Sequence, residues 1–178
     1  MKKFKNLFTL FIMLLTASIC HAQSAESIAN KVQVGVNIEG AFPTGDFSKA
    51  YSFGIGGSLM GRYPLSDKAK LTASLGYLNF SGKSITETYE SDGGPQTETY
   101  KAPSMYGVPL RVGANYLLGT TIFVQGEIGA AFMKGGTAFL YTPGIGARFS
   151  NLEVEAKYEG WSRNGTLSFF GIRAGYFF

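Results

Sequence analysis

The stretch T-L-S-F-F-G-I-R-A-G-Y-F-F, residues 166–178, decides the fold of this protein. From Phe170 to Phe178 its even-numbered positions are apolar, and the odd positions between them include Gly171, Arg173 and Gly175. Such alternation is typical of a β-strand with one apolar and one small or charged face. No later residue of the sequence is available to cover the apolar face. The stretch therefore favours a strand that closes a barrel.

Residues 1–22 are predicted to form a secretory signal peptide. Three lysines lie within the first five residues, residues 7–19 are apolar, and residues 20–22 (C-H-A) offer small side chains at the cleavage position. Lipidation of Cys20 is the alternative, but Ile19 before it is bulkier than such sites usually accept. The apolar run is shorter than the roughly 18 residues that a spanning helix needs. Insertion into a membrane would therefore have to use strands.

Removal of this segment would change the character of the chain. Three lysines and no acidic residue would leave with it, so the formal net charge falls from +4 to +1, and the case for a nucleic-acid partner disappears. The only Cys and the only His, Cys20 and His21, would leave as well, which excludes a disulfide framework. We expect residues 23–30 to be a short periplasmic leader and residues 31–178 to be one barrel domain.

Period-two alternation recurs through the rest of the chain and predicts eight antiparallel strands with no helix of consequence. The Asn164-Gly165 pair before the last strand is a strong hairpin signal. Pro109 and Pro143 interrupt two of the segments, where we expect a bulge or a local break in pairing. The alternating segments are residues 32–42, 51–63, 70–77, 106–116, 122–132, 139–149, 152–158 and 166–178.

Alternation fits two kinds of barrel, a soluble lipocalin-like one with an apolar interior and a membrane one with a polar interior. The polar face is rich in Gly and Ser, its charges nearly balance, and aromatic residues gather near the strand ends of the apolar face. Paired charges suit a closed interior, and aromatic girdles suit a membrane boundary. We therefore favour the membrane barrel. The predicted lumenal charges are Glu39, Arg62, Lys70, Arg111, Glu127, Arg148, Glu153, Glu155, Lys157 and Arg173, with Glu159 beside them.

The signal, the eight alternating segments, the aromatic end and two segments, V-P-L-R-V-G-A-N-Y (108–116) and G-I-G-A-R-F-S-N-L-E-V-E-A-K-Y (144–158), resemble the small Gram-negative outer-membrane β-barrel domain family. This family is similar in architecture to the OmpA and OmpX barrels. The resemblance implies an up-and-down transmembrane barrel, contact with lipid and lipopolysaccharide, and delivery to the barrel-insertion machinery. It also implies that Phe170, Tyr176 and Phe178 form part of an assembly signal.

The segment 81–100 is predicted to be the only long loop on the outer side of the membrane. It contains T-E-T-Y twice around a turn-forming centre, so we expect a hairpin that stands above the barrel. Such a hairpin would either recruit an extracellular protein strand by β-augmentation or be a solvated loop without a role. The residues expected in a partner site are Thr86, Glu87, Thr88, Tyr89, Thr97, Glu98, Thr99 and Tyr100.

Catalysis is not expected, because the mature chain would have no His to serve as a general base or metal ligand. We predict no catalytic residue, no metal site and no cofactor. The expected role is structural or interactive, through the outer loops. A narrow pore is the alternative, because Gly35, Gly54, Gly56, Gly76, Gly113, Gly144, Gly146 and Gly175 on the polar face would leave room for water.

Overall fold

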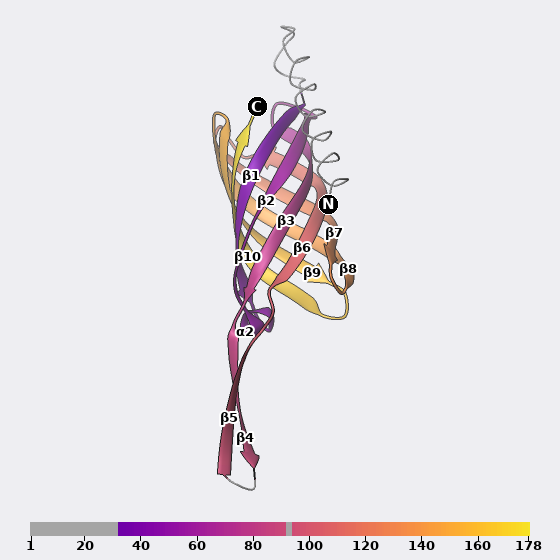
Figure 1. The fold of residues 1–178 in the computed structure, drawn as a ribbon. Coiled ribbons are helices and arrows are strands. Elements are labelled where there is room, and N and C mark those ends of the chain that lie inside the picture. The colour runs from indigo at the N-terminus through magenta and orange to yellow at the C-terminus, as the bar shows by residue number, and fades with distance from the viewer. Residues whose placement is uncertain (1–31, 92–93) are drawn as a thin grey trace, which may run out of the picture.

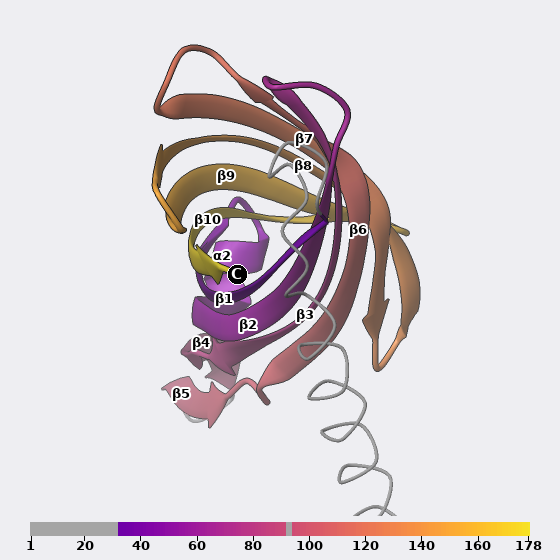
Figure 2. The same cartoon turned by 90° about the horizontal axis from the view of Figure 1, so that it is seen from above.

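Eight antiparallel strands form a closed barrel in the computed structural model, which describes residues 32–91 and 94–178. Each strand pairs with the next barrel strand along the chain, and the last pairs with the first (Figures 1 and 2). The predicted signal peptide and leader lie outside the described residues. The barrel strands are β1 (Gln33–Thr44), β2 (Tyr51–Pro64), β3 (Ala69–Gly82), β6 (Met105–Leu117), β7 (Ile122–Met133), β8 (Gly136–Phe149), β9 (Leu152–Ser162) and β10 (Thr166–Phe177).

The two ends of the barrel differ in their connections. At one end, which we call the terminus end, lie the start of β1, the C-terminus and the short connections 65–68, 118–121 and 150–151. The opposite end, the hairpin end, carries a one-turn helix, α2 (Phe47–Ala50), and a hairpin of β4 (Ser84–Ser91) and β5 (Gly94–Lys101). This hairpin projects well beyond the barrel (Figure 1). The predicted protruding hairpin is therefore present between β3 and β6.

The barrel is apolar outside and polar inside. Ile38 is 72% exposed on the outer surface, whereas its neighbour Glu39 is 2% exposed in the interior. The same alternation follows the other barrel strands, so the large aliphatic side chains point away from the lumen. A soluble lipocalin-like barrel needs the reverse arrangement, and that alternative is wrong. An apolar surface of this extent requires apolar surroundings.

Aromatic side chains border the aliphatic outer band at both ends. Tyr63, Tyr116 and Phe149 lie where β2, β6 and β8 reach the terminus end, and Phe42 and Phe139 lie near the hairpin end. Between the two belts, the exposed residues in the central part of each strand are mainly Ile, Leu and Val. Two aromatic belts around an aliphatic band are the arrangement of transmembrane barrels.

The two prolines do not shift the register. Pro109 pairs with Ala131 of β7, and Pro143 pairs with Gly126 of the same strand. On the opposite edge of each proline-containing strand, the ladder lacks two residue pairs and then resumes in the same register. These are the β3–β6 ladder at Pro109 and the β8–β9 ladder at Pro143. Because proline has no N–H to donate, the gap faces the neighbour it cannot bond. The expected local break is present, and the expected bulge is not.

A register shift does occur between Tyr51 and Phe53 at the start of β2. It moves Tyr51, which the alternation places on the outer face, to a partly buried position against Phe47 of α2, with ring centroids 5.0 Å apart. The predicted outward orientation of Tyr51 is wrong for this reason. Because of the shift, the first residue of β2 contacts α2 at the hairpin end of the lumen.

The inside-out arrangement predicts how the outer surface tolerates charge. Ile172 lies midway along β10, opposite Gly40 and Ala156. Replacing it with arginine should cost about 2–4 kcal/mol of unfolding free energy in lipid, because a cation at mid-membrane loses its hydration. Denaturant titration of the protein folded in phospholipid vesicles measures this cost.

Leu65→Arg is the matched control, since Leu65 is equally apolar and 58% exposed but lies in a connection at the terminus end. Its expected cost is about 0–1 kcal/mol, as for positions near the interface. Equal costs at the two sites would contradict placement of the barrel wall in a hydrocarbon layer.

Candidate functional site

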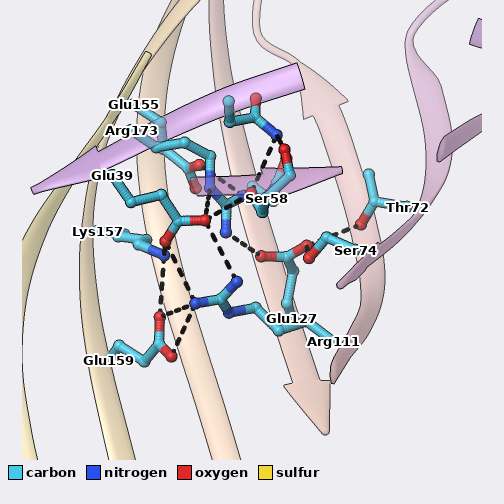
Figure 3. Close-up of polar contacts among 12 residues, drawn as sticks. Glu39, Ser58, Thr72, Ser74, Arg111, Glu127, Glu155, Lys157, Glu159 and Arg173 are labelled. Atoms are coloured by element: carbon cyan, nitrogen blue, oxygen red, sulfur yellow. Dashed lines mark hydrogen bonds and ion pairs between the residues drawn. The ribbon is translucent and has the colours of Figure 1, made fainter. Parts of the chain in front are cut away.

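Glu39 is the centre of a buried ion cluster in the middle of the lumen (Figure 3). Its carboxylate accepts a hydrogen bond from Lys157 Nζ at 2.6 Å and another from Ser58 Oγ at 2.6 Å. Arg111 Nη2 lies 3.3 Å from its Oε2, and Arg173 Nε lies 3.4 Å from its Oε1. One carboxylate on β1 therefore joins cations from β6, β9 and β10.

The remaining carboxylates of this cluster are shared between the same cations. Glu159 lies 2.9 Å from Arg111 Nη2 and 2.9 Å from Lys157 Nζ. Arg173 reaches Glu127 at 3.1 Å through Nη2 and Glu155 at 3.1 Å through Nη1. Such sharing compensates for the loss of hydration that a buried charge otherwise suffers.

A second polar group occupies the terminus end of the lumen. Arg62 forms a two-pronged ion pair with Glu153, and Arg148 Nε donates to the same carboxylate at 2.5 Å. The Arg62 guanidinium also lies over the Phe177 ring, 3.5 Å from its centroid. Lys70 donates to the Gln33 side chain at 2.7 Å, and no acidic partner is found for it within the described chain.

The hairpin end of the lumen is filled by an aromatic plug, which we define as Phe47, Phe80, Trp161 and Phe169. Phe80 makes edge contacts with the other three rings at centroid distances of 4.9–5.9 Å, and it is fully buried. The Trp161 indole N–H donates to Glu159 at 2.6 Å and so joins the plug to the ion cluster. We did not predict this plug, although large apolar residues at inward-facing positions were a signal for it.

Inward-facing glycines make room for these side chains. A Cβ added to Gly54 would lie 2.6 Å from the Phe80 ring, and one added to Gly107 would lie 2.6 Å from Trp161. Gly35 is covered by Phe177 in the same way. The lumenal glycines were expected to leave space for a water-filled passage. The space at these positions is instead occupied by neighbouring side chains.

The α2 turn and the base of the hairpin form a brace across the mouth of the barrel (Figures 1 and 2). The Lys83 N–H donates to Ala50 O at 2.8 Å, and Lys83 Nζ donates to Ser48 O at 2.7 Å. The Ala102 N–H in turn donates to Lys83 O at 2.9 Å. Because Phe47 of α2 belongs to the aromatic plug, the hairpin base is tied to the barrel interior.

The hairpin itself is a two-stranded sheet with an ordered threonine face. Thr86 lies opposite Thr99 with their hydroxyls 3.0 Å apart, and Thr88 lies opposite Thr97 at 3.4 Å. In the backbone register, Glu87 pairs with Glu98 and Tyr89 pairs with Gln96. In the part of the chain that the structure describes, β4 and β5 pair only with each other. Their outer backbone edges are open to a further strand.

The structure brings together most, but not all, of the residues singled out from the sequence. Nine of the predicted lumenal charges make ion pairs inside the barrel, and Lys70 stands apart from them. Phe170, Tyr176 and Phe178 lie on the outer surface, close to the seam between β10 and β1. The eight hairpin positions lie on β4 and β5, away from the ion cluster.

Residues 32–91 and 94–178 contain no group of three or more His, Cys, Asp or Glu side chains arranged to hold a metal ion. No helix among them has the length and apolar character needed to cross a bilayer.

Comparison with solved structures identifies the fold. Ail, the attachment invasion locus protein of Yersinia pestis, matches with a TM-score of 0.55 and 14% identity over 85% of this chain and 100% of Ail. Its structure in a phospholipid bilayer nanodisc matches with a TM-score of 0.55 and 17% identity over 83% and 100%. A de novo designed transmembrane β-barrel matches at 0.50 and 13% over 87% and 100%. No family model and no curated protein matches the sequence.

The protein thus has the fold of the small eight-stranded outer-membrane β-barrels, with a filled polar lumen and a protruding hairpin. This confirms the fold class and the resemblance inferred from the alternating segments. Sequence identities of this size concern the fold alone.

The brace predicts that Phe47 controls the order of the hairpin base. Phe47→Ala removes a ring that packs on Phe80 and Tyr51 but contributes nothing to the barrel ladders. We expect the barrel to remain closed while the Lys83 and Ala102 amides, which bond across the brace, exchange at least tenfold faster with solvent. Residue-resolved hydrogen exchange measures both amides.

Phe42→Ala is a matched control, because Phe42 lies on the outer face and contacts Phe53 rather than α2. It should leave both exchange rates unchanged. If Phe47→Ala also left them unchanged, the hairpin base would be held independently of the plug.

Proposed function

We propose that this protein is a non-enzymatic outer-membrane barrel whose β4–β5 hairpin binds an extracellular protein by strand addition. The observation that carries the proposal is a two-stranded sheet that projects from the barrel with both outer edges unpaired among the described residues. An open strand edge offers alternating N–H and C=O groups to an extended peptide. The brace at its base gives the sheet a defined orientation.

An outer-membrane location is supported by three independent features. The apolar outer band lies between two aromatic belts, as in proteins that cross a bilayer with strands. Residues 1–22 have the pattern of an export signal. Ail, which shares the fold, has been solved in a phospholipid bilayer. The predicted periplasmic leader before β1 places the terminus end on the periplasmic side. The hairpin end then faces the cell exterior, and the barrel contacts lipid and lipopolysaccharide.

The charge of the hairpin indicates the chemistry of its partner. Glu87, Glu90 and Glu98 lie on the hairpin, and the lysines of the segment, Lys83 and Lys101, lie at its base. The hairpin strands thus carry more acidic than basic residues, and this net negative charge favours a cationic partner. Ail was crystallised with sucrose octasulfate, a polyanionic heparin analogue. The acidic hairpin favours a basic peptide over such a polyanion.

A defined peptide probe tests strand addition. We expect a ten-residue peptide of alternating Lys and Thr to increase the exchange protection of amides along β4 or β5 in the isotope-labelled, micelle-folded protein. Binding of the same peptide, followed through the resonances of a labelled peptide, should vanish when residues 85–100 are replaced by an Asn-Gly turn, which shortens the hairpin but leaves the barrel strands intact. Nuclear magnetic resonance provides the residue-resolved readout.

Two controls separate strand pairing from charge attraction. The same peptide with every backbone nitrogen methylated keeps the charge but cannot donate to a ladder, so it should give no protection. A variant with Gln at positions 87, 90 and 98 keeps the open edges and should bind more weakly. Equal binding of the methylated peptide would contradict strand addition.

The pore alternative is tested separately by conductance. We expect no discrete channels from the refolded protein in a planar bilayer, because the aromatic plug and the ion cluster fill the lumen. The heat-dependent shift in gel mobility that is expected of a folded membrane barrel confirms insertion of the same preparation. Reproducible discrete channels from the intact protein would establish the pore instead.

A further inference from the structure

Three buried polar atoms on neighbouring strands of the lumen have no hydrogen-bond partner. They are the Gln125 amide nitrogen Nε2, the Thr142 hydroxyl Oγ1 and the Glu155 carboxylate oxygen Oε1. All three side chains are at least nine-tenths buried. A buried polar atom without a partner is costly, so three of them in one place indicate a missing ligand.

The three residues lie around Gly144 of β8. Gln125 pairs directly with Gly144 across the β7–β8 ladder, and Thr142 precedes Gly144 by two residues on the same face. The Glu155 carboxylate of β9 extends over Gly144, since a Cβ added there would collide with Oε1. Adjacent strands are about 5 Å apart and residues two apart on one strand about 7 Å apart, so one small molecule among these three side chains can bridge them.

The orientation of Gln125 is set by the polar group at the terminus end. Arg148 Nη2 donates to Asn115 Oδ1 at 3.2 Å, and Asn115 Nδ2 donates to Gln125 Oε1 at 3.1 Å. Because an arginine can only donate, the amides of Asn115 and Gln125 must both follow in this direction. Gln125 Nε2 therefore points onward as a donor, towards an acceptor that the described residues do not supply.

We infer that a single water molecule binds over Gly144 and is ligated by Gln125, Thr142 and Glu155. The ligand must accept a hydrogen bond from Nε2 and donate one to a carboxylate oxygen. A metal cation cannot accept, and an anion cannot donate and is repelled by Glu155. Water does both, and Thr142 Oγ1 completes three contacts, the usual number for a buried water.

The water connects the two polar groups of the lumen. Donation runs from Arg148 through Asn115 and Gln125 to the water, and from the water to Glu155. Glu155 Oε2 lies 3.1 Å from Arg173 Nη1, which belongs to the ion cluster. Hydrogen bonds and the Glu155–Arg173 ion pair thereby connect the polar group at the terminus end to the central cluster along the barrel axis.

Water contact at the Gln125 side chain tests the inference in the unaltered protein. In micelles, the Gln125 amide protons should show magnetisation transfer from a slowly exchanging water. A crystal structure should show one water within about 2.6–3.2 Å of all three atoms. A direct hydrogen bond between Gln125 Nε2 and Glu155 Oε1, with no water signal, would overturn the inference.

A matched pair of variants assigns the role of Thr142. Thr142→Ser keeps the hydroxyl and should keep the water signal, whereas Thr142→Val keeps the shape and should reduce the signal at Gln125 at least threefold. An undiminished signal in Thr142→Val would remove Thr142 from the site. If either variant fails to fold, the measurement on the unaltered protein still decides the inference, and neither result depends on what the hairpin binds.

Discussion

The balance of charge inside the barrel is the constraint on which the rest of the structure depends. An apolar outer surface leaves the lumen as the only place for the charged side chains of the strands, and the lumen is closed. Each carboxylate of the cluster around Glu39 must then pair with a cation that a different strand supplies. Breaking one partner of such a buried group typically costs about 3–5 kcal/mol, since the other charge remains without compensation. The cluster therefore adds to the backbone ladder in specifying which strands face each other across the lumen.

Small and large residues divide the interior between them. Glycine on one strand allows an aromatic or charged side chain of a neighbouring strand to lie flat against the wall, as Phe80 does over Gly54 and Lys157 does beside Gly171. An eight-stranded barrel has just enough interior to be filled in this way. The filling differs along the axis, with the aromatic plug near the hairpin end and the Arg62, Arg148 and Glu153 group near the terminus end. A barrel sealed in this manner places interaction with other molecules at its loops.

Much of the fold could be predicted from the alternation of odd-numbered and even-numbered residues, because the period of two assigns each residue to a face once a strand is recognised. The ion-pairing residues followed from the same rule. The partners within the lumen could not be predicted, since they depend on stagger between strands that are distant in sequence, as between Arg62 and Glu153. Phe47 escaped prediction because it lies in a connection, and Tyr51 because a register shift reverses its side. The water site depends on unpaired atoms, which only three-dimensional positions reveal.

Trp161 has a consequence of another kind. It is the only tryptophan in the chain, and its indole lies between the rings of Phe80 and Phe169 while its N–H donates to Glu159. Its surroundings come from β3, β9 and β10, so they exist only when strands from both halves of the barrel have come together. The protein thus carries an intrinsic fluorophore whose emission reports closure of the barrel without any added label.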